Sequence, residues 1–287
     1  GQTSYPVFFH TTLADAALRK VNYRQNILKE IISTETTYVN DLRALIDYWK
    51  PALRRSNYFT DHDISFFFGD LPDILKLHVH FKQSLEDRGT DFDSIVSDVF
   101  IKFSSLFNVS KRFISTYAIF SYILNEKAQA NKNSTTILQN LSKSNTFEEG
   151  RDLTSYLITP VQRMPRYILF LRELVKYSPQ EHPDFPLLEK AMNSIVSVTR
   201  GIDLFTNSSR RIAQIMSNFS KPLFIFKEGR SLIDFSTVYV SQSPTPFDQY
   251  STGTYQSASA PKEGFFYLFN DSVLMTTIDQ ISSPKAK

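Results

Sequence analysis

The chain has 287 residues, of which 41% are hydrophobic and 21% charged, so a folded core is favoured and wholesale disorder is excluded. It contains no Cys, which excludes disulfides, thiolate metal sites and a cysteine nucleophile. The net charge of +3 is too small to indicate nucleic acid binding, and all of it lies in the first 220 residues. We expect neither a membrane span nor a signal peptide, because no long apolar run is present.

The first three-quarters of the chain shows helical periodicity. Apolar residues at intervals of three and four predict a helix over residues 24–49, begun by a weak capping box at Asn22 and Gln25 and ended by Pro51. Pro72 would mark a break or a new first turn in the next helix. The further predicted helices cover residues 64–85, about 92–107, about 111–130, 151–177 and 187–216.

Residues 131–150 are polar and are predicted as a loop, with a helical turn or two over 135–141. After about residue 220 the pattern changes to strands. We predict strands over 231–240 and two more within 264–277, the last two joined by a turn at Asn270 and Asp271, with a loop over 241–260. The sequence therefore predicts a mainly α fold, an elongated helical bundle followed by a β-rich segment. The 25 Phe are interpreted as core packing in the bundle.

Glu35 is out of place in the first helix, because apolar residues flank it on both sides of the helical stripe. A carboxylate buried without a partner is costly. One interpretation is that Glu35 lies at the edge of the stripe in solvent, and the other is that it faces a partner protein or an internal cation.

The segment around Pro160 and Pro165 must be broken or kinked, because both prolines fall within six residues. Helical spacing brings Gln162, Arg163 and Arg166 onto or near one face. As an alternative to a binding role, one of the two arginines would pair with a carboxylate inside the domain.

The stretch LTSYLITPVQRMPRYILFLRELVKYSP, residues 153–179, resembles the third conserved region of Dbl-homology (DH) domains, the exchange factors for Rho-family GTPases. Residues 31–42 resemble the first conserved region, and residues 228–229 with 266–271 look like the start of the pleckstrin-homology (PH) domain that usually follows. The QRMPRY motif is most similar to the FYVE-containing, faciogenital-dysplasia-like subgroup. The resemblance implies an N-terminal arm over 1–22, a DH domain over 23–218 and an incomplete PH-type segment over 219–287.

The resemblance implies a guanine-nucleotide exchange factor for a Rho/Rac-family GTPase, without covalent chemistry, cofactor or metal. In this family Glu35 would contact switch I, Arg166 would support switch II, and Ile158 would help to select the GTPase, with Ile resembling Rac-directed members. We expect Glu35→Ala or Arg166→Ala to remove exchange without unfolding the protein. The full predicted GTPase-binding set is Glu35, Tyr38, Ile158, Gln162, Arg163, Arg166 and Asp203.

Asp203 departs from the family pattern, which has Asn at the matching position of the last long helix. An ionised Asp accepts hydrogen bonds but cannot donate them, so Asp203 either pairs with a cation on the GTPase or the match is wrong by one turn. The departure keeps a second class open, an exchange-inactive scaffold that binds a GTPase or another signalling protein.

Residues 231–261 contain no Lys or Arg, so we expect weak phosphoinositide binding at the site usual in PH domains, with Lys227, Arg230 and Lys262 as the nearby bases. Peripheral membrane contact, a cytoplasmic location and recruitment to membrane or actin cytoskeleton are expected from the resemblance, and no nucleic acid partner is expected. The apolar arm residues would pack on the bundle or would cover the exchange face and inhibit it; they are Val7, Phe8, Phe9 and Leu13.

Overall fold

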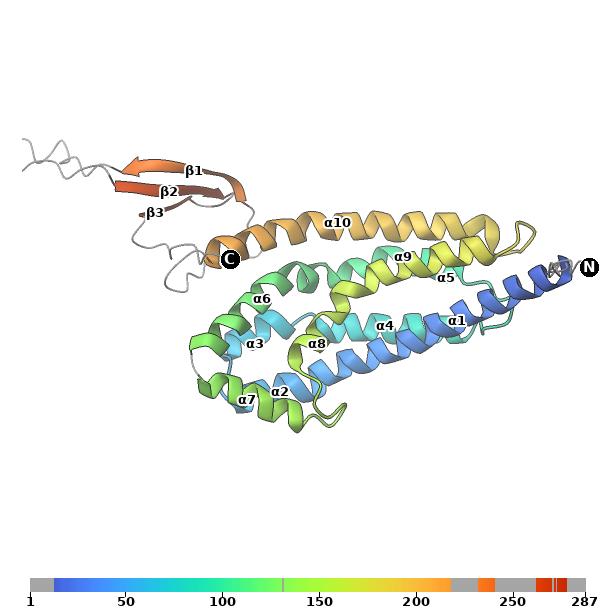
Figure 1. The fold of residues 1–287 in the computed structure, drawn as a ribbon, viewed down its shortest axis with the longest axis horizontal. Coiled ribbons are helices and arrows are strands. Elements are labelled where there is room, and N and C mark those ends of the chain that lie inside the picture. The colour runs from blue at the N-terminus through green and yellow to red at the C-terminus, as the bar shows by residue number, and fades with distance from the viewer. Residues whose placement is uncertain are drawn as a thin grey trace, which may run out of the picture. The chain divides into compact units, whose positions relative to one another are not determined.

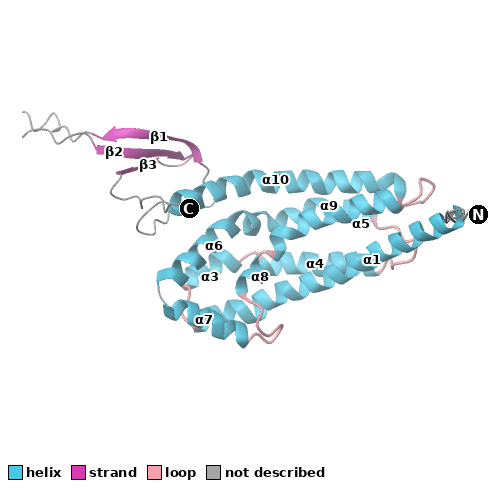
Figure 2. Ribbon diagram, viewed as in Figure 1, coloured by secondary structure: helices cyan, strands magenta, loops and turns pink. Residues whose placement is uncertain are grey.

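A computed structural model describes residues 13–130, 132–217, 232–240, 262–269, 271 and 273–277 (Figure 1). Most described residues are helical and the described strands form one sheet, which confirms the mainly α fold (Figure 2). No helix among the described residues has the length and hydrophobicity needed to cross a membrane. The predictions for residues 1–12 of the N-terminal arm, the 241–260 loop, Lys227 and Arg230 lie outside the described residues. Residues 13–22, predicted as the end of that arm, belong instead to the first helix.

The first helix is longer than predicted. Helix α1 spans Leu13–Arg43, so Asn22 lies inside it and the predicted capping box is wrong, since the strong helix formers of residues 13–20 extend the helix. A π-helical turn, Ala44–Trp49, leads directly into α2, Lys50–Arg55. Pro51 therefore does not end the helical path. It sits in the first turn of α2, directly after the π turn, where a missing backbone N–H is tolerated.

The predicted second helix is two helices. Helix α3, Asp61–Phe68, begins at a capping box in which Asp63 N donates to Thr60 Oγ1 at 3.1 Å and Thr60 N donates to Asp63 Oδ2 at 3.1 Å. Helix α4, Leu71–Glu86, has Pro72 in its first turn, which confirms Pro72 as a new start.

Two later segments differ from expectation. Residues predicted as a loop with a turn or two form a complete helix, α7, because Ile137, Leu138 and Leu141 supply a half-buried face. The kinked segment breaks only at Ile158, while Pro165 lies inside the helix that follows. The remaining helices are α5 Ser97–Ser104, a 3₁₀ turn Ser105–Ser110, α6 Lys111–Ala130, α7 Lys132–Lys143, α8 Leu153–Leu157, α9 Thr159–Tyr177 and α10 Phe185–Ser217.

The chain divides into two compact units, and each is described by itself. The first comprises residues 1–117 and 131–203, and the second comprises residues 118–130 and 204–287. In the core of the first unit, the Tyr167 ring lies between the rings of Phe81, Phe100 and Phe107, at centroid distances of 5.4, 5.6 and 5.4 Å. The interpretation of the Phe content as core packing is confirmed at these three positions.

The second unit contains the sheet. Strands β1 Leu232–Val240, β2 Lys262–Phe269 and β3 Val273–Thr277 are antiparallel neighbours in the order β1-β2-β3, which confirms the predicted strands. Within this unit, Tyr122 Oη of α6 donates a hydrogen bond of 3.0 Å to the carbonyl of Met216 of α10, which joins these two helices.

Candidate functional site

Glu35 lies buried in the interior of the first unit. Its side chain is 0% exposed, so the interpretation that it lies in solvent at the edge of the stripe is wrong. Helix α1 carries it to where α1 packs against both α4 and α9. The alternative of an internal cation is confirmed, because Arg163 of α9 forms an ion pair with it.

Both oxygens of the Glu35 carboxylate are occupied. Oε1 accepts from His78 Nδ1 at 2.8 Å, and because an ionised carboxylate only accepts, the ring nitrogen is the donor. Oε2 accepts from Arg163 Nε at 3.0 Å, from Arg163 Nη2, and from the Tyr167 hydroxyl at 2.6 Å. Three helices, α1, α4 and α9, are thereby joined at one buried carboxylate.

Two further α1 side chains complete the surroundings of Arg163. Thr34 Oγ1 accepts from Arg163 Nη1 at 3.3 Å, and the guanidinium lies 5.4 Å from the centroid of Tyr38 and 4.6 Å from that of Tyr167. The guanidinium is therefore held by hydrogen bonds in its plane and by aromatic rings on its faces. We call Glu35, His78, Arg163 and Tyr167 the buried lock.

The burial of the lock governs its ionisation. Burial by itself would raise the pKa of the Glu35 carboxyl, but the Arg163 charge and the contacts with His78 and Tyr167 outweigh it and hold that pKa below its usual value of 4.5. Burial raises the pKa of the Tyr38 and Tyr167 hydroxyls. Glu35 and Arg163 therefore form a charged pair and both tyrosines stay neutral.

A pH dependence of stability follows from Glu35. Because its pKa is lower in the folded protein, its contribution is complete above the unfolded pKa of about 4.5 and is lost as pH falls through the folded pKa. We expect the free energy of unfolding, measured by urea titration, to fall less steeply below about pH 5 in Glu35→Gln than in the wild type. Equal slopes in the two proteins would contradict the assignment.

The other predicted site residues lie at the surface. Gln162, Arg166 and Asp203 are exposed, and Ile158 is half-buried at the break between α8 and α9. Arg166 Nη2 is 3.3 Å from Oε1 of Glu30 on α1, and both side chains are about half exposed. A surface ion pair of this kind contributes little to stability, so the Arg166 guanidinium is available to a partner.

The structure thus separates the predicted set into two groups. Glu35, Tyr38 and Arg163 are buried together, which differs from the expectation that they lie at a binding surface, and their role toward a GTPase stays a prediction. The sequence interpretation missed His78 as the second partner of Glu35, although the signal was present. His78 is polar but shares the apolar face of residues 74, 81 and 85 on α4, as Glu35 does on α1.

The comparison with known protein families agrees with this helical arrangement. Residues 27–203, which contain the buried lock and all of the predicted surface residues, match the RhoGEF domain. The chain belongs to the RhoGEF domain family.

Relatives among curated proteins come from Dictyostelium discoideum and from mammals. The chain is 28% identical over 272 residues to Rac guanine nucleotide exchange factor JJ of Dictyostelium discoideum, covering 91% of this chain and 22% of that protein. It is 26% identical over 286 residues to Rac guanine nucleotide exchange factor B of the same organism, covering 88% and 23%. The chain spans less than a quarter of the length of either relative.

Solved structures show the same fold at lower identity. The DH/PH domains of p115-RhoGEF superpose with a TM-score of 0.69 at 17% identity, covering all of this chain and 84% of that chain. The PDZ-RhoGEF DH/PH domains, solved in complex with GTP-gamma-S activated RhoA, superpose with a TM-score of 0.65 at 15% identity, covering 95% and 79%.

Proposed function

We propose that this chain is the exchange module of a guanine-nucleotide exchange factor for a Rho/Rac-family GTPase. The observation that carries the proposal is the match of residues 27–203 to the RhoGEF domain, with Gln162 and Arg166 exposed on the helix that the buried lock holds. Two curated relatives are Rac exchange factors by name, which supports a Rac-type partner.

The exchange reaction needs no bond to be made or broken by this chain. A protein that binds the nucleotide-free GTPase more tightly than the loaded form must, by linkage, weaken nucleotide binding by the same factor. Remodelling of the switch regions would displace Mg²⁺ and open the phosphate site. A rigid surface suits this task, because the binding free energy is then directed at the GTPase and not at ordering the exchange factor.

The two groups of site residues have different roles in this proposal. Arg166 and Gln162 would contact the switch regions directly, with Ile158 and Asp203 at the edges of the contact. Glu35 and Arg163 would act indirectly, by holding α9 against α1 below the binding surface. A direct contact between Glu35 and switch I would require one of the internal hydrogen bonds of Glu35 to break.

The function is tested by release of a fluorescent GDP analogue from a panel of Rho-family GTPases. We expect release to accelerate for at least one Rac-type member, and an acceleration for none of the panel would overturn the proposal. Arg166→Ala should reduce the accelerated rate by roughly ten- to a hundredfold, because a hydrogen bond to a charged group contributes about 1.5–3 kcal/mol.

The Arg166 variant has an internal control. Its side chain is exposed and its pair with Glu30 is weak, so the melting temperature should stay close to that of the wild type. Arg172→Ala removes an exposed arginine from another face of α9 and should leave the rate unchanged. Equal rates for Arg166→Ala and wild type would show that Arg166 does not contribute to the contact with the GTPase.

Asp203 is the observation that favours a second candidate, an exchange-inactive scaffold that binds a GTPase. Its carboxylate is exposed on α10 where the family has an amide donor, and an ionised carboxylate cannot replace that donor. The same panel separates the candidates, because a scaffold would bind the nucleotide-free GTPase without accelerating release. Asp203→Asn would then create exchange activity.

For the C-terminal segment we propose a PH-type segment after a DH domain that ends near residue 218, in a protein of the faciogenital-dysplasia-like subgroup. The antiparallel β1-β2-β3 sheet and the QRMPRY motif support this. Lys262 begins β2 opposite Val240. Because residues 231–261 contain no Lys or Arg, phosphoinositide binding should be weak. A cytoplasmic location with recruitment to membrane or actin cytoskeleton follows from the proposed partner.

A further inference from the structure

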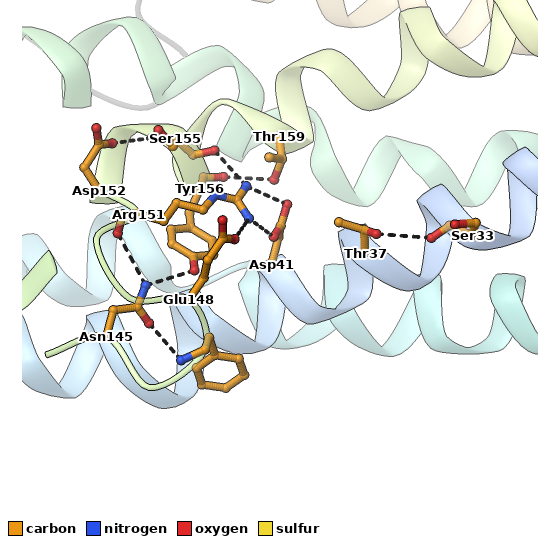
Figure 3. Close-up of polar contacts among 11 residues, drawn as sticks. Ser33, Thr37, Asp41, Asn145, Glu148, Arg151, Asp152, Ser155, Tyr156 and Thr159 are labelled. Atoms are coloured by element: carbon orange, nitrogen blue, oxygen red, sulfur yellow. Dashed lines mark hydrogen bonds and ion pairs between the residues drawn. The ribbon is translucent and has the colours of Figure 1, made fainter. Parts of the chain in front are cut away.

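Arg151, in the connection between α7 and α8, makes a dense set of contacts that the proposed exchange surface does not use. Its Nη1 and Nη2 donate to the two carboxylate oxygens of Asp41 on α1, at 2.6 and 3.0 Å. Nη2 also donates to the carbonyl of Ser155 at 3.2 Å, and the guanidinium lies 4.0 Å from the centroid of Tyr156 (Figure 3). The Asp41 side chain is 7% exposed, so this two-bond pair is largely shielded from water.

The connection that carries Arg151 is itself held in one conformation. Ser142 Oγ donates to the carbonyl of Gly150 at 2.7 Å, and Gly150 N donates back to the carbonyl of Ser142 at 3.0 Å. Gly150 has φ of 82°, a value that favours glycine. Asn145 Nδ2 donates to the Tyr156 hydroxyl at 2.9 Å (Figure 3). Arg151 therefore joins a closed loop to α1.

The position of the two α1 carboxylates gives this contact its significance. Glu35 and Asp41 are six residues apart, about 9 Å along a helix axis. Glu35 holds Arg163, five residues after Ile158, and Asp41 holds Arg151, seven residues before it. The break between α8 and α9 is thus fixed to α1 on both sides, and Ile158 lies between the two fixed points.

From this geometry we infer that Arg151 is a positioning residue for GTPase selection, acting through Asp41 to set where Ile158 meets the GTPase. The inference rests on the proposed exchange function. Arg151 would not itself contact the GTPase, because its guanidinium is turned to Asp41 and Tyr156. Loosening α8 would move Ile158 relative to α9, whose exposed Arg166 stays held through the buried lock.

The test compares exchange rates on two Rho-family GTPases, a Rac type and a RhoA type. We expect Arg151→Ala to change the ratio of the two rates by about five- to tenfold, because small displacements of an apolar contact alter discrimination by such factors. A loss of folded protein would lower both rates equally and leave the ratio unchanged. Amide hydrogen exchange at Ile158, Val161 and Gln162 should also accelerate in the variant.

Matched variants make the result decisive. Glu148→Gln removes the exposed carboxylate 3.1 Å from Arg151 Nη1 and should leave the ratio as it is, while Asp41→Asn should change it as Arg151→Ala does. An active wild type with an unchanged ratio in Arg151→Ala overturns the inference and leaves the proposed function standing. A wild type inactive on every GTPase overturns both.

Discussion

Glu35→Ala should destabilise the helical domain by about 3–5 kcal/mol, the usual cost of removing one partner from a buried ion pair. The substitution removes the carboxylate that pairs with the Arg163 guanidinium, whose side chain is 4% exposed and which keeps its 3.3 Å hydrogen bond to Thr34. It also removes the acceptor of His78 Nδ1 and of the Tyr167 hydroxyl. Because whole domains are stable by about 5–15 kcal/mol, this loss is a large part of the total.

Urea unfolding followed by circular dichroism measures the effect directly. Tyr167→Phe is the matched comparison, because it removes a single hydroxyl from the same carboxylate and keeps the ring. It should cost less, about 1.5–3 kcal/mol, the usual contribution of one hydrogen bond to a charged group. Glu35→Leu combined with Arg163→Met should cost less than the sum of the two single changes, since no unpaired charge stays inside. Additive losses in that double variant would show that the two side chains do not act as a pair.

This result revises the expectation from sequence that Glu35→Ala acts on exchange alone. A low exchange rate in that variant would partly report unfolded protein, so the rate must be normalised to the folded fraction. Arg166→Ala, in contrast, changes an exposed side chain, so it is still expected to lower exchange without unfolding the protein. An undiminished free energy of unfolding in Glu35→Ala would restore the first expectation and place Glu35 at the surface in solution.

The sequence predicted the helices, and the polar residues that stand out within them, better than it predicted the contacts between helices. Helical periodicity located most of the bundle, because apolar spacing depends only on local geometry. It also singled out Glu35 and allowed that an arginine of the kinked segment pairs inside the domain. The place of His78 on the apolar face of α4 indicated a buried polar side chain but not that its partner is Glu35, since the relative rotation of α1 and α4 is set by packing between helices and not by either stripe alone.

Helix starts were missed for a related reason. The predicted helix at about residue 92 begins instead at Ser97, where the backbone N–H groups of Val96 and Ser97 donate to Asp184 Oδ1 at 3.2 and 3.0 Å. The capping carboxylate comes from a residue 87 positions away in the chain. Sequence rules for helix caps look only a few residues upstream, so they cannot detect a cap of this kind.

Asp184→Ala is therefore expected to be as damaging as Glu35→Ala, at about 3–5 kcal/mol, although Asp184 is no part of the exchange surface. Its other oxygen, Oδ2, accepts from Arg24 Nη2 at 2.9 Å, and both side chains are 0% exposed. The substitution would leave a buried guanidinium bonded only to the carbonyls of Phe92 and Ser94 and the hydroxyl of Ser178. It would also leave two uncapped amides at the start of α5.

Thermal and urea unfolding of Asp184→Ala and of Asp61→Ala provide the comparison. Asp61 forms a 2.7 Å pair with Arg54, but their side chains are 82% and 53% exposed, so its loss should cost no more than about 1 kcal/mol. Below its melting temperature, Asp184→Ala should exchange nucleotide at the wild-type rate per folded molecule. Asp184 joins Arg24 of α1 to the residues just before α10, and the hydrogen bond from Arg24 to Ser178 at the end of α9 does not depend on it. A rate that falls while the protein stays folded would show that this pair also supports the exchange surface.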